Sequence, residues 1–140
     1  MKSIYYFDCD KQSPQAILMG MKFAAMKSRK NQSEVIVFVP QLEQVNGGIF
    51  TKALGRETAR AFLNKRALRV GGTLFRLVSD RTFSNTYSND VILAVWVSKT
   101  MRKKLEDSIC KELVVVPLRR EENLDWAMAQ SAQIMSIVAE

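Results

Sequence analysis

The chain has 140 residues, 47% of them hydrophobic and 25% charged, which is the composition of one globular domain large enough to bury an apolar core. Lys and Arg number 21 and Asp and Glu 14, so the net charge is +7, and this favours phosphates, nucleic acid or acidic proteins as partners. The chain has no histidine, which excludes His-dependent triads, imidazole metal ligands and histidine general bases.

Two further features bear on location. No apolar run approaches the roughly 20 residues that a bilayer requires, and Met1–Asp10 lacks the basic, long-apolar pattern of a signal peptide. Cys9 and Cys110 are too few for a disulfide framework and are expected to remain thiols packed in the core. We therefore expect a cytoplasmic protein in which residues 1–140 form one domain.

The first predicted element is a short apolar strand, Ile4–Phe7. A helix follows, with Ser13 as its N-cap and Pro14 as its first residue, and it is expected to run to about Ser28. Apolar residues surround much of this helix, which indicates deep packing. The next strand, Val35–Val39, is apolar throughout.

The middle of the chain predicts a basic helix, a strand and a loop. The helix covers about Phe50–Asn64, with apolar residues on one face and Lys52, Arg56 and Arg60 on the other at spacings of four. Thr73–Ser79 is a strand candidate whose central Arg76 favours an edge position or a partly open face. Arg81–Asp90 is polar and predicts a loop. This strand therefore either joins the parallel sheet or pairs antiparallel with Val91–Val97.

The last third of the chain predicts two more strands and two more helices. Val91–Val97 and Leu113–Val116 are apolar runs, and a short helix over about Lys99–Ser108 lies between them. A final helix is expected over about Glu122–Val138, because acidic residues precede an apolar stripe and favour the positive end of a helix dipole. The stripe consists of Leu124, Met128, Ser131, Met135 and Val138.

The order of these elements predicts the fold class. Four of the strand candidates are apolar without alternation, which is typical of strands that helices cover on both faces. Strands alternating with helices favour a parallel sheet. We therefore predict an α/β protein, a three-layer sandwich of the Rossmann-like or flavodoxin-like type, with about five mostly parallel strands and helices on both faces.

The predicted fold nominates a binding site, because ligands of open α/β sheets bind outside the carboxyl ends of the strands. Backbone groups and Thr100 at a helix start would bind phosphate, Lys99 would supply charge, and Asp8 or Asp10 would contact a sugar or a cation. The candidate ligand-binding residues are Asp8, Asp10, Gly47, Gly48, Ser98, Lys99 and Thr100. Our preferred interpretation is a non-catalytic or regulatory domain that binds an anionic ligand such as a nucleotide, with no cofactor identified.

A motif near the N-terminus suggests an enzymatic alternative. Asp8-Cys9-Asp10 after an apolar strand, with Ser98 and Lys99 near a later strand end, resembles the haloacid dehalogenase family. The resemblance implies a metal-dependent phosphohydrolase that uses Asp8 and Asp10. Gln12 stands where that family has threonine, and no paired carboxylates follow a later strand, so Mg²⁺ would lack ligands and no metal site is assigned. The glycine spacing matches neither the dinucleotide fingerprint nor the GxxxxGK phosphate loop.

Charge distribution suggests a third function. Residues 27–69 hold nine Lys or Arg against three Glu, and a nucleic-acid-associated accessory protein would place such cations along a phosphate backbone. The residues concerned are Lys52, Arg56, Arg60, Lys65, Arg66 and Arg69. Aromatic residues do not interleave with them as a stacking platform requires. A homo-oligomer or another protein partner, contacting Trp96, Trp126 or the last helix, also remains open.

Overall fold

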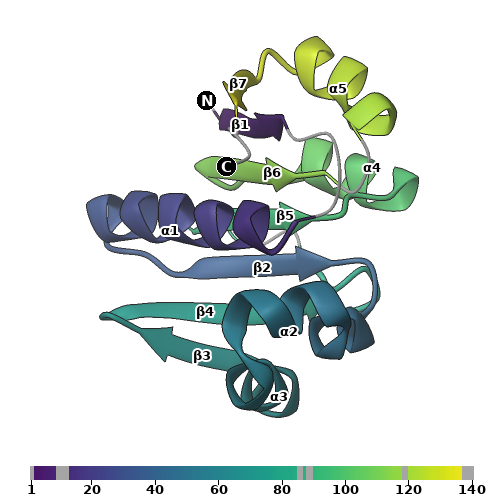
Figure 1. Ribbon diagram of the computed structural model, residues 1–140. Helices are drawn as coiled ribbons and strands as arrows, with labels where there is room; N and C mark the ends of the chain where they lie inside the picture. Colours follow the sequence, from purple (N-terminus) through teal and green to yellow (C-terminus); the bar gives the residue numbers. More distant parts are fainter. Residues whose placement is uncertain (1, 9–12, 85–86, 88–89, 118–119, 137–140) are drawn as a thin grey trace.

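Seven strands form one sheet in the order β3-β4-β2-β5-β6-β1-β7 (Figure 1). The computed structural model describes residues 2–8, 13–84, 87, 90–117 and 120–136. The strands are β1 (Ser3–Asp8), β2 (Val35–Val39), β3 (Ala67–Val70), β4 (Thr73–Ser79), β5 (Val91–Val95), β6 (Glu112–Val116) and β7 (Gln133–Ser136). The helices are α1 (Pro14–Asn31), the 3-10 helix η1 (Leu42–Asn46), α2 (Gly48–Leu54), α3 (Arg56–Lys65), α4 (Lys99–Asp107) and α5 (Arg120–Ala129).

The mostly parallel α/β sandwich is confirmed, with seven strands instead of about five. Every strand pairing is parallel except that of β3 with β4. The two strands that the sequence did not predict, β3 and β7, are the edge strands. Both are four residues long and have partly exposed side chains, so neither shows the continuous apolar pattern of the inner strands.

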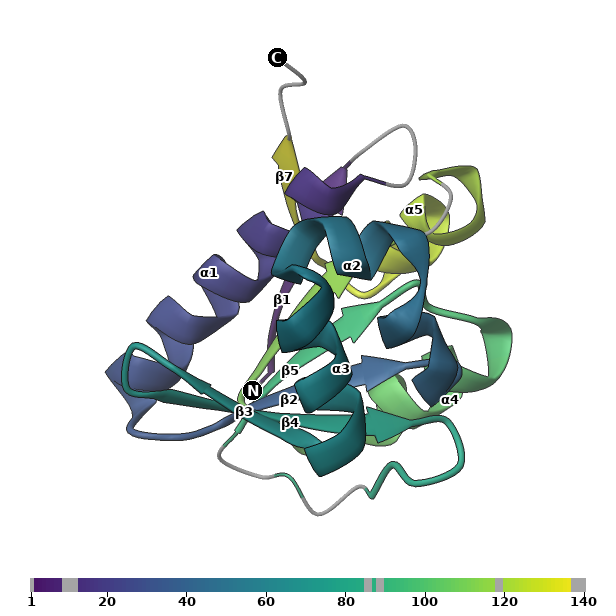
Figure 2. The ribbon, with the colours of Figure 1, turned by 60° about the horizontal axis from the view of Figure 1, so that its bottom comes forward.

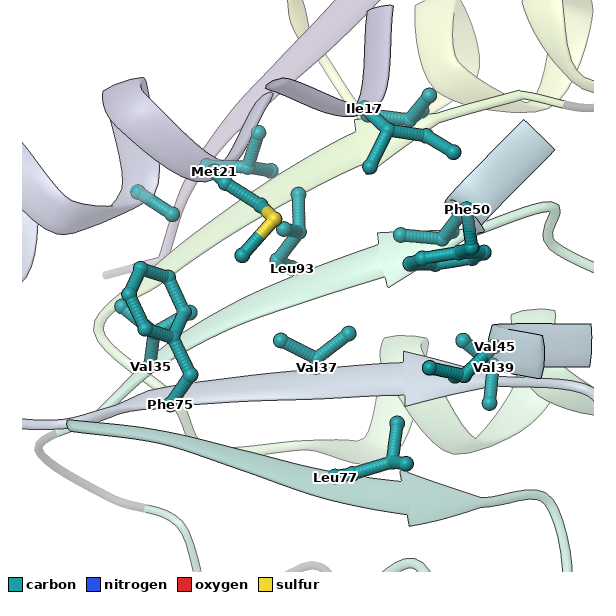
Figure 3. Close-up of a cluster of buried hydrophobic side chains, with 14 of the residues drawn as sticks. Ile17, Met21, Val35, Val37, Val39, Val45, Phe50, Phe75, Leu77 and Leu93 are labelled. Carbon is teal, nitrogen blue, oxygen red and sulfur yellow. The ribbon is translucent and has the colours of Figure 1, made fainter. Parts of the chain in front are cut away.

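Helices cover both faces of the sheet, and β2 shows the consequence for sequence. Val35, Val37 and Val39 pack into a core beneath α1, α2 and α3 (Figure 3). Ile36 and Phe38 point to the opposite face, where α4 and α5 supply the covering side chains. All five residues of β2 are buried, because successive side chains of a strand point to opposite faces and both faces are covered.

Helix α1 begins as predicted. The Ser13 side chain accepts hydrogen bonds from the backbone N–H groups of Gln15 and Ala16, at 3.1 and 3.4 Å, and Pro14 is the first helical residue. The helix lies against β5 and β6, and Gly20 makes this approach close. A Cβ atom on Gly20 would lie 2.7 Å from a methyl carbon of Val116. The helix extends to Asn31, three residues beyond the predicted end.

The predicted helix over Phe50–Asn64 is wrong in one respect, because it is two helices. Gly55 separates α2 from α3 and has φ of 87° and ψ of 150°, a conformation that residues with a Cβ atom avoid. Phe50 and Phe62, one from each helix, are both fully buried beneath the sheet. Lys52 therefore does not share a continuous helix face with Arg56 and Arg60.

Strand β4 is parallel to β2 and does not pair with β5. Of the two alternatives predicted for Thr73–Ser79, the edge position is wrong, because β3 pairs antiparallel with its outer side, whereas the partly open face is confirmed by exposed Arg76. Arg76 nevertheless points to solvent and forms a salt bridge with Glu34. In the connection from β4 to β5, Phe83 stacks on Phe38 with ring centroids 4.2 Å apart, so an aromatic side chain of a loop helps to cover this face.

The final helix is also shorter than predicted. It ends at Ala129, and residues 133–136 form β7, which is parallel to β1. Ser131, expected on the helix stripe, has φ of 60° in the turn between them, and Met135 lies in the strand. Val138 lies outside the described residues. Within the described part of the chain, no helix has both the length and the apolar character needed to cross a bilayer.

Candidate functional site

The carboxyl ends of the six parallel strands lie along one edge of the sheet, which we call the rim; the arrowheads of β2, β5 and β6 point towards it, to the right, in Figure 1. Asp8 is the last residue of β1. The residues that directly follow β2, β4 and β6 are Pro40, Asp80 and Pro117. Strands β2 and β5 are neighbours in the sheet. The chain leaves β2 towards α2 and α3 on one face of the sheet, and it leaves β5 towards α4 on the opposite face. Crevices form where neighbouring connections diverge in this way.

Trp96 lies at this divergence, directly after β5. Its φ is 59°, which is unusual for a bulky residue, and its N–H donates to the Val116 carbonyl at 2.7 Å. The side chain is 8% exposed and packs edge to face on Phe50, with centroids 5.2 Å apart. Trp96 is therefore buried within this chain and fixes the end of β5 to α2.

Asp80 connects the end of β4 to α4. Its Oδ2 accepts a hydrogen bond from the Thr100 hydroxyl, and its Oδ1 lies 2.7 Å from Lys104 Nζ. Lys104 also donates to the Asp80 backbone carbonyl. The Thr100 and Ser98 hydroxyl oxygens are 3.1 Å apart. These four residues form one polar cluster at the rim, which we call the Asp80 cluster.

The electrostatics of the cluster keep Asp80 ionised. Burial on its own would raise the pKa of the Asp80 carboxyl, but hydrogen bonds from Lys104 and Thr100, together with the Lys104 charge, hold that pKa below its ordinary value. A carboxylate with a lowered pKa that accepts from one hydroxyl and pairs with one ammonium group is a weak proton acceptor. Asp80 therefore suits a structural role better than general base catalysis.

The start of α4 is also fixed by internal contacts. Ser98 caps the helix by accepting from the Met101 N–H at 3.4 Å. Beside it, a hollow of about 350 Å³ is lined by Val97, Ser98, Lys99 and Arg102. The Arg102 guanidinium donates to the Asn123 side chain at 2.8 Å, and the buried Asn123 donates to the Val97 carbonyl at 3.2 Å. Lys99 is exposed, so its charge is available to a ligand.

A larger cleft, which we call the rim cleft, lies between the carboxyl ends of β2 and β4. Its volume is about 670 Å³, and it is lined by Pro40, Gln41, Leu42, Glu43, Ser79, Arg81 and Thr82. The hydroxyl oxygens of Ser79 and Thr82 are 3.3 Å apart, and Thr82 also accepts from the Ser79 N–H at 2.9 Å. Arg81 is exposed and forms no salt bridge with any described residue. The cleft therefore offers hydroxyls, one cation and one carboxylate to a ligand.

The described candidate residues come from several strand ends. Ser98 and Thr100 lie in the Asp80 cluster and Lys99 is their neighbour. Asp8 is half-buried at the end of β1, two strand spacings or about 10 Å from the end of β5, the strand that precedes Ser98, Lys99 and Thr100. Asp10 and Cys9 lie outside the described residues. Among the described candidates, Ser98, Lys99 and Thr100 therefore lie together, and Asp8 lies two strands away along the same rim.

The backbone N–H of Gly47 is already hydrogen-bonded within the chain. Gly47 has φ of −83°, and its N–H donates to the Gln44 carbonyl at 3.0 Å. Gly48 is the first residue of α2, a helix of seven residues. These residues lie on the α1 face of the sheet, whereas α4 lies on the other face. Gly47 and Lys99 therefore belong to different layers.

The basic residues of the second predicted function come from α2, α3, the turn after α3 and β3, elements that are neighbours in Figure 2. All six are exposed, and none forms a salt bridge with a described residue. They are Lys52, Arg56, Arg60, Lys65, Arg66 and Arg69, and we call this set the basic surface. Glu57 is the one acidic residue between positions 52 and 69. Arg56 and Arg60 share one face of α3, since they are four residues apart.

The described residues offer little support for metal chemistry. Among residues 2–8, 13–84, 87, 90–117 and 120–136, no three acidic or cysteine side chains come together as metal ligands would. Cys110 is buried, and burial raises the pKa of its thiol. A buried thiol with a raised pKa is a poor nucleophile, so this cysteine suits a packing role.

The fold and rim define this chain as a mostly parallel, three-layer α/β protein with a polar cleft at the carboxyl ends of its strands. Comparison with protein-family models, with curated proteins and with solved structures finds no match to the chain.

Sequence reasoning missed Arg81, Thr82 and Lys104. Lys104 follows Thr100 by four residues on α4, a spacing that places two side chains on one helix face. The sequence could therefore have indicated that Lys104 lies beside Thr100. Arg81 and Thr82 directly follow the strand end at Asp80, but they lie in a segment whose polar composition indicated only a loop.

Proposed function

We propose that the protein is a non-catalytic binder of a small anionic ligand with hydroxyl or amino groups, such as a nucleotide, and that the ligand occupies the rim cleft. One observation carries the proposal: a cleft of about 670 Å³ lies at the carboxyl ends of β2 and β4 and presents a cation without a salt-bridge partner among the described residues. This volume is within the roughly 300–1,000 Å³ typical of small-molecule sites.

Each lining group has a role in this proposal. Arg81 binds the anionic group of the ligand, since a guanidinium donates two parallel hydrogen bonds to a phosphate or carboxylate. Ser79 and Thr82 donate or accept through their hydroxyls, and Glu43 accepts from a sugar hydroxyl or a base amine. Lys99, next to Thr100 of the Asp80 cluster, adds positive charge to the rim. The Thr100 hydroxyl donates to Asp80, so this proposal assigns the phosphate contact to Arg81 and not to Thr100.

The test is a thermal-shift and calorimetric titration of the full chain with mononucleotides, at low and moderate salt. A ligand that binds only the folded protein raises its melting temperature. We expect Arg81→Glu to abolish this shift and Lys30→Glu, an equal charge change at an exposed position of α1, to retain it. A nucleotide response that survives Arg81→Glu, or no response to any mononucleotide, would contradict the proposal.

We also propose that the protein is cytoplasmic, and cell fractionation checks this location.

The basic surface supports a second candidate, nucleic-acid binding, because six exposed cations occur there with one acid among them. Such contacts release counterions, so affinity falls steeply with salt. We expect Arg56→Glu with Arg60→Glu to abolish binding of a short oligonucleotide and to leave mononucleotide responses unchanged. A double variant of equal charge change, Lys30→Glu with Lys111→Glu, is the control. Equal losses in both double variants would indicate attraction by net charge alone.

A further inference from the structure

A second hollow lies away from the rim, on the face of the sheet that α1 covers. Its volume is about 460 Å³, and we call it the α1 groove. Leu18, Met21, Lys22, Ala25 and Arg29 of α1 form one wall, and Leu54, Thr58, Leu68, Val70, Gly71 and Phe75 form the rest. The tip of the β3–β4 hairpin and the last turns of α1 lie on the same side of the molecule in Figures 1 and 2. The groove therefore runs between helix and hairpin.

The lining of the α1 groove is apolar, with positive charge along one wall. Seven of its side chains are aliphatic, aromatic or methionine, and no acidic residue lines it. Lys22 and Arg29 are seven residues apart on α1, which places them on one face at a separation of about 10.5 Å along the helix. Both are exposed, and neither forms a salt bridge with a described residue.

Exposure at the hairpin tip shows that this apolar surface is accessible. Val70 is 53% exposed although it lines the groove. Phe75, in contrast, is 4% exposed and forms part of the buried core, with Met21 beside it in Figure 3. The hollow therefore leads from exposed apolar surface at its edge to the core beneath. An occupant would exchange water for apolar contacts along this path.

We propose that the α1 groove binds an amphipathic monocarboxylate, that is, a molecule with an aliphatic chain and one carboxylate, such as a medium-chain fatty acid. The chain lies along Leu18, Val70 and Phe75, and the carboxylate pairs with Arg29 or Lys22. The volume is that of a small-molecule site, and the charge of the wall is opposite to that of the ligand head group. This site is separate from the rim cleft and shares no lining residue with it.

The probe for the test is dodecanoate, titrated calorimetrically into the full chain below the concentration at which dodecanoate forms micelles. Dodecyltrimethylammonium has the same chain with the opposite charge and is the matched ligand control. We expect saturable one-to-one binding of dodecanoate and at least about tenfold weaker binding of the cation. Equal binding of both amphiphiles, or none of dodecanoate, would overturn the proposal.

Two variants locate the ligand. Lys22→Glu with Arg29→Glu removes the head-group contacts, and Val70→Asp places a charge on the chain path. All three positions are exposed, so folding is expected to persist and is checked by circular dichroism. We expect each variant to weaken dodecanoate binding at least about tenfold, whereas Lys30→Glu with Lys111→Glu leaves it within about twofold. Unchanged affinity in both test variants would refute this site. Loss of dodecanoate binding in Arg81→Glu would instead place the ligand in the rim cleft and refute the groove.

Discussion

At the scale of single residues, the Asp80 carboxylate links the end of β4 to α4 through Thr100 and Lys104. We predict that Asp80→Asn lowers the free energy of unfolding at pH 7 by about 1 kcal/mol, because Lys104 loses its ionic partner in a partly exposed pair. Chemical denaturation monitored by circular dichroism measures the difference. Asp107→Asn on the same helix is the control, since its pair with Lys103 is at the surface and little change is expected.

The pH dependence of this effect has a definite sign. A carboxyl whose folded pKa is lowered stabilises the fold fully above its unfolded pKa, about 3.9, and the contribution is lost as the pH falls through the folded pKa. The difference between the natural chain and Asp80→Asn is therefore expected to be constant from pH 7 to about pH 5 and to shrink below about pH 4. A difference that grows on acidification would show that Asp80 is destabilising when ionised.

Thr73, at the amino end of β4, is a position where removal of a polar group is expected to stabilise the fold, in contrast to Asp80. Its side chain is 2% exposed, and its hydroxyl has no hydrogen-bond partner among the described residues. We predict that Thr73→Val raises the free energy of unfolding by about 1 kcal/mol, since valine has the same shape without a hydroxyl to desolvate. Thr100→Val makes the same chemical change at a hydroxyl that donates to Asp80, and denaturation should show a loss of stability there.

The residues of the rim illustrate how far the sequence predicts a site. The strand-end rule places Ser98, Lys99 and Thr100 at the rim, and the structure has them there. It does not predict that the Thr100 hydroxyl bonds to Asp80, because that contact depends on which strands are neighbours and on where α4 lies. Strand order is a long-range property that a single sequence does not display.

At the scale of elements, Gly55 determines where α2 ends and α3 begins. We predict that Gly55→Ala lowers the free energy of unfolding by about 1–3 kcal/mol, since φ of 87° disfavours any residue with a Cβ atom. Gly48→Ala is the matched control. A Cβ at either position meets no atom within 4 Å, but Gly48 is helical, so alanine there is neutral or stabilising. Equal effects in denaturation experiments would contradict this account of the helix break.

Helix ends explain the other errors of sequence interpretation. After α5, the Ser131 N–H donates to the Met128 carbonyl and the Ala132 N–H to the Ala127 carbonyl, both at 3.0 Å. This Schellman pattern usually has glycine at the left-handed position, but here Ser131 occupies it, with φ of 60°. Gln32 ends α1 in the same way, with φ of 54°. Without a glycine to indicate the stop, the apolar spacing suggested that the last helix continued into β7.

At the scale of the whole molecule, the apolar pattern was sufficient for the fold class. The inner strands are buried on both faces by side chains of different layers, so their continuous apolar sequences predict a covered sheet. The edge strands β3 and β7 each pair on one side and carry partly exposed side chains, so their sequences lack that signal. The rim cleft lies between the connections that follow β2 and β4, and the α1 groove lies between α1 and the β3–β4 hairpin. Both positions depend on which strands are neighbours in the folded sheet, so the sequence alone does not predict them.

The contact between α1 and the sheet can be tested by adding one methyl group at Gly20. We predict that Gly20→Ala lowers the free energy of unfolding by about 1–3 kcal/mol despite the higher helix propensity of alanine, because its Cβ would lie 2.7 Å from a methyl carbon of the stiff, buried Val116. Val116→Ala alone also destabilises, since it leaves a cavity. The double variant should be more stable than the sum of the two losses implies, because each change relieves the defect of the other. Additive losses in a double-mutant cycle would mean that α1 moves away from β6 instead of pressing against Val116, and the close approach at Gly20 would then not determine the position of the helix.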